Sequence, residues 1–193
     1  MYDIPTAVNI NGISYDIRNR GDFRVILDCF DALADESLTA KERLIACLII
    51  FYADINTASD IEKFSDVEKA VKQMFLFFNC GQEESPGNQS KYHLVDWRTD
   101  SQLICSAINK VAGKEIRAEN YLHWWTFMGY YIAIGESTLS TVVSIRNKIL
   151  KGKKLEKYES EFRRNNPQYF AWNAKSTQAK EEDRLVRELW NSN

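Results

Sequence analysis

The residues of this chain that could hold a metal or act as nucleophiles are four cysteines and two histidines. The closest two cysteines are 18 positions apart, and the full set is Cys29, Cys47, Cys80 and Cys105. None of them forms a Cys-x-x-Cys pair, and His93 and His123 cannot complete a Cys/His zinc site at the usual spacing. We therefore expect reduced, mostly buried thiols and no metal site.

Phosphate-binding and nucleophile motifs are also missing. No two glycines are close enough for a Walker A loop or a G-x-G-x-x-G turn. Residues 135–139 resemble G-x-S-x-G but have Leu139 where the last glycine belongs, so Ser137 is better read as a helix cap. An enzyme needs polar groups that converge in a pocket, and none can be named here. We expect a protein that is not an enzyme and needs no cofactor.

The densest cluster of unusual residues is aromatic and spans residues 121–131, where six of eleven side chains carry an aromatic ring. On a helix they fall on more than one face, and a helix that is apolar all round is buried among neighbours. The favoured interpretation is that this helix lies in the core of the C-terminal half, with Trp125 packed inside. The alternative is a partner-binding surface, because Trp and Tyr dominate interface hot spots. Its candidates are Trp124, Phe127 and Tyr131.

Charge is spread unevenly along the chain. The net charge is −2, yet residues 1–145 carry −7, and residues 146–164 hold eight basic residues against three acidic ones. A lysine-rich helix is often only a solvated face. As a binding surface, this stretch favours an acidic protein partner or the acidic part of another copy over nucleic acid, because the chain as a whole is acidic. The candidate partner-binding residues are Arg146, Lys148, Lys151, Lys153 and Lys154.

Length and composition set the class. The 193 residues are 45% hydrophobic and 27% charged, which suits one medium globular domain or one domain with a tail. No apolar run reaches the ~18 residues of a membrane span, and the start of the chain has no apolar signal core. We expect neither membrane insertion nor secretion.

The elements that would position these residues are mostly helices. Alternation in residues 7–10 and 13–17 around Asn11-Gly12 predicts a β-hairpin with a type I′ turn. Helical periodicity follows, with capping boxes at Thr39 and Ser65. The predicted helices cover about 23–35, 39–53, 65–80, 99–112, 119–134, 139–150, 153–164 and 177–190. The fold class is therefore mainly α, a multi-helix bundle with a short N-terminal β-hairpin.

The domain organisation follows from a polar segment with Pro86-Gly87. We expect an N-terminal hairpin with helices over 1–80, an exposed linker over 81–90, a helical C-terminal half over 91–165, and a tail over 166–193 with one helix.

The chain resembles a phage protein family. The segments Leu122-His123-Trp124-Trp125, Ile134-Gly135-Glu136 and residues 143–148 look like the bacteriophage family called "gene product fifteen", as do residues 151–155, Tyr158-Glu159 and Glu161-Phe162. The resemblance is strongest over about 95–165. The family occurs in tailed phages and prophages of Gram-positive hosts and is encoded between the tail tube and tape measure proteins.

That resemblance implies a tail assembly chaperone in the host bacterial cytoplasm, whose partners are the tape measure protein and the tail tube protein. It implies no catalytic or ligand residue. A possible homo-oligomer follows from the charge pattern, and no nucleic-acid or membrane partner is expected. The alternatives are a structural tail or connector component that stays in the virion, and a small DNA-binding regulator that uses the basic stretch.

Overall fold

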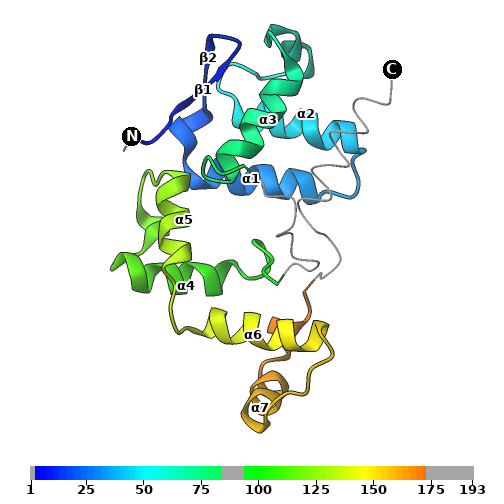
Figure 1. Ribbon diagram of the computed structural model, residues 1–193, viewed down its shortest axis with the longest axis vertical. Coiled ribbons are helices and arrows are strands. Elements are labelled where there is room, and N and C mark those ends of the chain that lie inside the picture. Colours follow the sequence, from blue (N-terminus) through cyan, green and yellow to red (C-terminus); the bar gives the residue numbers. More distant parts are fainter. Residues whose placement is uncertain (1–2, 84–93, 173–193) are drawn as a thin grey trace. The chain divides into compact units, whose positions relative to one another are not determined.

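A computed structural model describes residues 3–83 and 94–172 of the chain (Figure 1). Its architecture is mainly α-helical with one two-stranded antiparallel hairpin, which confirms the fold class predicted from the sequence. The described residues form two compact units. The first comprises residues 3–83 together with Tyr121–Met128, and the second comprises residues 94–120 and 129–172.

The hairpin opens the first unit. Strands β1 (Ala7–Ile10) and β2 (Ile13–Asp16) pair antiparallel, and Ile10 lies opposite Ile13 across the turn. Asn11 and Gly12 both have positive φ, as the predicted type I′ turn requires. A two-stranded hairpin is marginal alone, and here β1 packs on α3 (Val67–Phe78).

Side-chain caps define the helices of this unit, which are α1 (Phe23–Ala34), α2 (Ala40–Phe51) and α3. The predicted capping box at Thr39 is present, since its hydroxyl accepts from the Glu42 N–H and the Glu42 carboxylate accepts from the Thr39 N–H. The prediction for Ser65 was wrong by one residue. Asp66 is the N-cap of α3 and accepts from the Lys69 N–H, because a carboxylate next to the serine satisfies the same donors.

The C-terminal end of α2 is held by an arginine from a distant part of the sequence. The Arg18 guanidinium donates to the backbone carbonyls of Ile49, Ile50 and Tyr52 at 2.9–3.1 Å. These carbonyls lie where a helix runs out of its own donors and where a positive charge complements its dipole. The hairpin end is thereby tied to α2. A 3-10 segment, η2 (Ala58–Lys63), then leads from α2 toward α3.

The second unit is built on α4 (Ser101–Ala112) and α6 (Thr138–Leu150), which pack on each other. Gly113 and Gly152 follow these helices with positive φ, at the positions where the sequence predicts the ends. Ser137 accepts from the Ser140 N–H and caps α6, as expected for the imperfect G-x-S-x-G segment. The remaining elements are η3 (Ile116–Ala118), α7 (Lys157–Asn165) and η4 (Pro167–Phe170).

Two predicted helices are shorter than expected. The segment predicted as a helix over 119–134 becomes helical only at α5 (Trp124–Ile132), and the segment 153–164 only at α7. Residues 121–128 also group with the N-terminal residues, which a division of the chain in sequence order does not anticipate. Most of the predicted linker 81–90 and the predicted helix 177–190 lie outside the described residues.

No helix among residues 3–83 and 94–172 is both long and apolar enough to cross a membrane.

Candidate functional site

The adjacent tryptophans of α5 close the C-terminal end of α3. The Trp124 indole N–H donates to the Phe78 carbonyl, and the Trp125 indole N–H donates to the Phe77 carbonyl, each at 2.9 Å. Both carbonyls lie in the last turn of α3. The Phe77 carbonyl also accepts from the Cys80 N–H at 3.0 Å, whereas the Phe78 carbonyl depends on the Trp124 indole. Neighbouring helix positions point about 100° apart, so two indoles can reach two successive carbonyls. The pair therefore acts as a cap for another helix.

Trp124 and Phe127 lie in the core of the first unit, each 1% exposed. Phe127 stacks on Phe23 with ring centroids 4.7 Å apart, and Trp124 meets Phe30 edge to face. Trp124 and Phe127 are thus core residues and not part of the partner surface considered as the alternative, whereas Trp125, which we assigned to the core, is half-buried and hydrogen-bonded to the Phe77 carbonyl. Periodicity groups residues by face, but in an all-aromatic helix it does not say which face turns inward.

His123 begins α5 and is buried. Its Nδ1 accepts from the Trp125 backbone N–H at 3.0 Å, which leaves Nε2 to donate to the Pro5 carbonyl at 2.9 Å. Burial lowers the pKa of His123 below its ordinary 6.5, and the hydrogen bond to Pro5 and the charge of Asp22 partly oppose this. The histidine is therefore neutral at pH 7 and acts as a cap, not as a ligand.

Tyr131 belongs to the second unit, where its ring lies 5.2 Å from that of Trp97. Burial, and then the charge of Asp100, raise the pKa of the Tyr131 hydroxyl. Because Trp124 and Phe127 are buried in the first unit, the three residues do not form one exposed surface.

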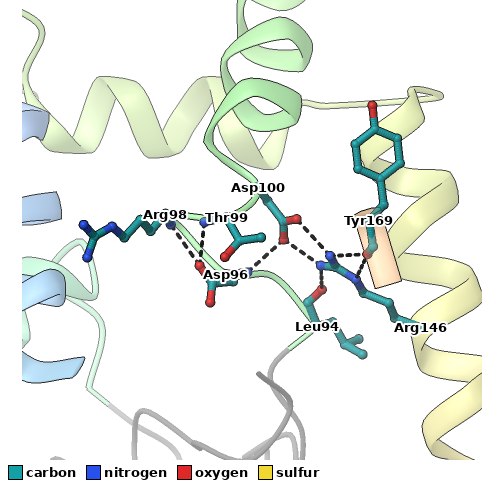
Figure 2. A network of polar contacts seen from close by, with 7 residues as sticks. All are labelled: Leu94, Asp96, Arg98, Thr99, Asp100, Arg146 and Tyr169. Atoms are coloured by element: carbon teal, nitrogen blue, oxygen red, sulfur yellow. Dashed lines mark hydrogen bonds and ion pairs between the residues drawn. The ribbon is translucent and has the colours of Figure 1, made fainter. Parts of the chain in front are cut away.

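Arg146 is fully buried and organises the second unit (Figure 2). Its guanidinium makes a bidentate ion pair with Asp100, with N···O distances of 2.6 and 2.9 Å. It also donates to the carbonyls of Leu94 and Tyr169, and its plane lies 4.6 Å from the ring centroid of Trp172. Asp100 in turn accepts from the Asp96 N–H. One side chain of α6 thus joins the start of α4, the segment before α4 and η4.

This placement corrects the prediction that Arg146 binds a partner. Its charge is neutralised by Asp100, and its donors are directed at backbone carbonyls inside the unit. A planar fork with five donors suits such a site, which a lysine could not fill. Sequence charge alone cannot separate a buried arginine from a solvated one.

Lys148 is also engaged within the unit. Its ammonium contacts both carboxylate oxygens of Glu159 at 2.7 and 2.8 Å and so joins α6 to α7. Glu159 is buried, and the hydrogen bond from Lys148 lowers the pKa of its carboxyl group.

What remains of the predicted basic surface is the turn between α6 and α7. Lys151, Lys153 and Lys154 are exposed there, as is Lys157 at the start of α7. None of these four makes an ion pair with any residue in the described ranges. We call these four lysines the basic turn. Tyr158, 66% exposed, lies beside them.

A second charged surface was missed in the sequence. Asp28, Asp31, Asp35 and Glu36 are exposed along the C-terminal part of α1 and just beyond it. Their spacing of three, four and one residues would place the three aspartates on one helix face, and this signal was available. Partial burial, and then the charge of Asp31, raise the pKa of Asp28. We call these four residues the acidic end of α1.

Within the described ranges, no group of three or more His, Cys, Asp or Glu side chains is placed to hold a metal ion. Cys29 and Cys47 are buried and face each other across α1 and α2, where each thiol lies close to the other's backbone carbonyl. Burial raises the pKa of the Cys29 thiol well above its usual range, so it stays protonated and unreactive.

Comparison with known proteins gives one match. A family model described as "Bacteriophage Gp15 protein" matches residues 1–170, a range that includes every helix and strand of the described chain. No curated protein and no solved structure matches the chain. The tryptophan pair that caps α3, the hydrogen-bond partners of Arg146 and the basic turn all fall inside the matched range, and only Trp172 of the Arg146 contacts lies beyond it. The chain belongs to the bacteriophage Gp15 protein family.

Proposed function

We propose that this phage protein is a non-enzymatic tail assembly chaperone that binds the tape measure protein in the host cytoplasm and promotes assembly of the tail tube. The observation that carries the proposal is the family match over residues 1–170. The family resemblance implies a gene placed between those for the tube and tape measure proteins, where long-tailed phages encode such chaperones.

The surface chemistry supports a role in protein binding. The second unit is held together by the buried Arg146–Asp100 ion pair and the partly exposed Lys148–Glu159 pair, so the exposed lysines of the basic turn are not needed for its internal structure. An amphipathic helix with acidic residues on its polar face could contact these lysines with its charges and Tyr158 with its apolar side. Tape measure proteins are long helical clients, and such a contact would hold them in solution.

The test is co-expression of this chain with the tape measure protein of the same phage. We expect the client to stay in the soluble fraction and to co-purify with the chain, and we expect purified virions to lack the chain. A client that aggregates to the same extent with and without the chain would contradict the proposal. Presence of the chain in virions would favour the structural tail component instead.

A variant pair sharpens the experiment. Lys153→Gln with Lys154→Gln removes two exposed charges and should weaken client capture by about tenfold, because exposed ion pairs each contribute about 0.2–1 kcal/mol. Lys41→Gln with Arg98→Gln is the matched control, since both side chains are exposed and make no ion pair or side-chain hydrogen bond with any residue in the described ranges. Equal loss of capture in both variants would mean that only net charge matters.

A further inference from the structure

Four lysines of the second unit are exposed on a well-defined turn. Gly152 has φ +63°, and the Lys153 N–H donates to the Lys148 carbonyl at 2.8 Å, which together close the end of α6 in a Schellman motif. The ion pair between Lys148 and Glu159 fixes α7 on the other side of the turn. The basic turn is therefore held in one conformation, while the lysine ammonium groups themselves stay in water.

The acidic end of α1 is the complementary surface of the first unit. Asp31 lies in the last turn of α1 and Asp35 is its C-cap, where the helix dipole disfavours negative charge. Asp28, Asp31 and Glu36 make no ion pair with any residue in the described ranges. Hydrogen bonds from the Ser37 hydroxyl and N–H, and then the charge of Arg43, lower the pKa of Asp35. The Arg43 guanidinium itself donates to the carbonyls of Leu38 and Leu33. Three carboxylates without a partner charge thus lie near a helix end that does not favour them, beside an Asp35 that is stabilised by Ser37.

The two units also differ in overall charge. Residues 3–83 hold 14 Asp and Glu against eight Lys and Arg, a formal charge of −6. The described part of the second unit holds eight Asp and Glu against 12 Lys and Arg, a formal charge of +4. Approach of a second copy is therefore favoured when its first unit meets the basic turn.

We propose that the basic turn of one copy binds the acidic end of α1 of a second copy. The basic turn presents four lysines, and the acidic end of α1 presents four carboxylates. None of the lysines faces an opposite charge within its own described unit, and at most one of the carboxylates does. The contact is heterologous, so it leaves one free surface of each kind on every pair and builds rings or open chains. This inference concerns association between copies and stands whether or not the chain binds a tape measure protein.

An acidic protein surface fits the basic turn better than nucleic acid does. The exposed carboxylates of Glu156 and Glu161 interrupt the positive charge around the turn. A duplex presents a continuous line of phosphates, about one charge per 1.7 Å, that would have to pass these carboxylates, whereas a patch of four carboxylates can contact the lysines alone. The charge of −6 on the first unit adds long-range repulsion. Binding to nucleic acid therefore becomes an outcome that the test can detect and not the proposal itself.

The experiment uses two neutralised variants of the full chain. The turn variant carries Lys151→Gln, Lys153→Gln and Lys154→Gln, and the stripe variant carries Asp28→Asn, Asp31→Asn and Glu36→Gln. Each loses one of the two complementary surfaces and keeps the other. Three exposed ion pairs at their ordinary strength correspond to a loss of about 3- to 150-fold in self-association for either variant. The stripe variant should melt at the same or a higher temperature, because it removes repulsion at a helix end.

Mixing the variants gives the decisive measurement. In the mixture, the intact acidic end of α1 of the turn variant can bind the intact basic turn of the stripe variant. Both surfaces that remain on such a pair are neutralised, so no further copy can be added. Light scattering at low salt should show larger, concentration-dependent masses for the native chain, monomer for each variant alone, and a dimer for the mixture. The dimer should weaken as salt is raised from 50 to 500 mM, since charges beyond the screening length cease to attract.

Three outcomes would overturn the proposal. The native chain could stay monomeric at low salt and high concentration, the two variants could assemble as the native chain does, or the mixture could remain monomeric. Salt-sensitive retention of a DNA duplex by the native chain and not by the turn variant would assign the basic turn to nucleic acid instead.

Discussion

Removal of the Arg146 side chain should destabilise the second unit more than any change to an exposed lysine. In Arg146→Met the carboxylate of Asp100, 1% exposed, keeps the Asp96 N–H as a donor but loses its cation. The carbonyls of Leu94 and Tyr169 also lose their donor. Breaking a buried ion pair from one side costs about 3–5 kcal/mol, which is a large part of the total stability of a small domain.

Matched variants separate the charge from the geometry. Arg146→Lys keeps the positive charge but cannot form the planar fork, and we expect a loss of about 2 kcal/mol. Arg146→Met combined with Asp100→Leu removes both charges and should recover at least half of the loss, because no buried charge is left alone. Lys151→Ala at the end of the same helix is the control and should change stability by less than about 0.5 kcal/mol.

The assay is urea denaturation followed by far-ultraviolet circular dichroism, with tryptophan fluorescence as a second probe because Trp172 stacks on the guanidinium. The free energy of unfolding is compared across the native chain and the four variants. If Arg146→Met loses less than about 1 kcal/mol, the buried network does not carry the stability assigned to it here. If the double variant is less stable than Arg146→Met, the Asp100 carboxylate left without a cation is not what destabilises the single variant.

Three further predictions concern the first unit. Trp124→Phe should lower the free energy of unfolding by about 1–3 kcal/mol, because it leaves the buried Phe78 carbonyl without a donor. Trp125→Phe should lower it by clearly less, because the Phe77 carbonyl keeps the Cys80 N–H. Melting curves of the two variants measure these losses, and the reverse order would show that Trp124 is not the core residue. Because the pKa of His123 in the folded chain lies below the unfolded value of 6.5, the unfolded chain binds the proton more tightly. The melting temperature should therefore fall as the pH drops below about 6.5. A His123→Asn variant with the same pH dependence as the native chain would show that another group is responsible. Thr39→Ala should lower the free energy of unfolding by about 1 kcal/mol and Ser65→Ala by less than half of that, because only the threonine caps a helix. Equal losses in denaturation experiments would show that Ser65 also acts as a helix cap.

Local rules in the sequence predicted the fold well where the controlling residues are neighbours. The Asn11-Gly12 turn, the Thr39 box and the stop at Gly152 each depend on a few adjacent residues, and the structure has them where expected. The start of α5 was missed by five residues. His123 caps that helix with a side chain whose other nitrogen contacts Pro5, 118 positions away, and no local pattern shows such a contact.

The candidate site was predictable only as a list of residue types. The sequence identified the aromatic segment and the basic stretch, but it could not divide either into buried and exposed members. That division depends on partners from distant positions, such as Asp100 for Arg146, 46 residues away, and the α3 carbonyls for the two tryptophans. A backbone carbonyl leaves no trace in residue type, so its need for a donor cannot be read from sequence.

The division into buried and exposed charges changes what a binding surface on this protein can be. Of the five basic residues first considered for partner binding, Arg146 and Lys148 are satisfied inside the second unit, so any partner meets only ammonium groups. Lysines act as mobile point charges and recognise a pattern of negative charge more than a particular shape. Contacts of this kind form quickly, are weak singly, and can be released by modest changes in salt or by a competing acidic surface. The tail assembly chaperone proposed above would need binding of this strength, since it must hold a partner during assembly and then leave it. The buried Arg146 network would keep the backbone of the basic turn in place through each cycle of binding and release.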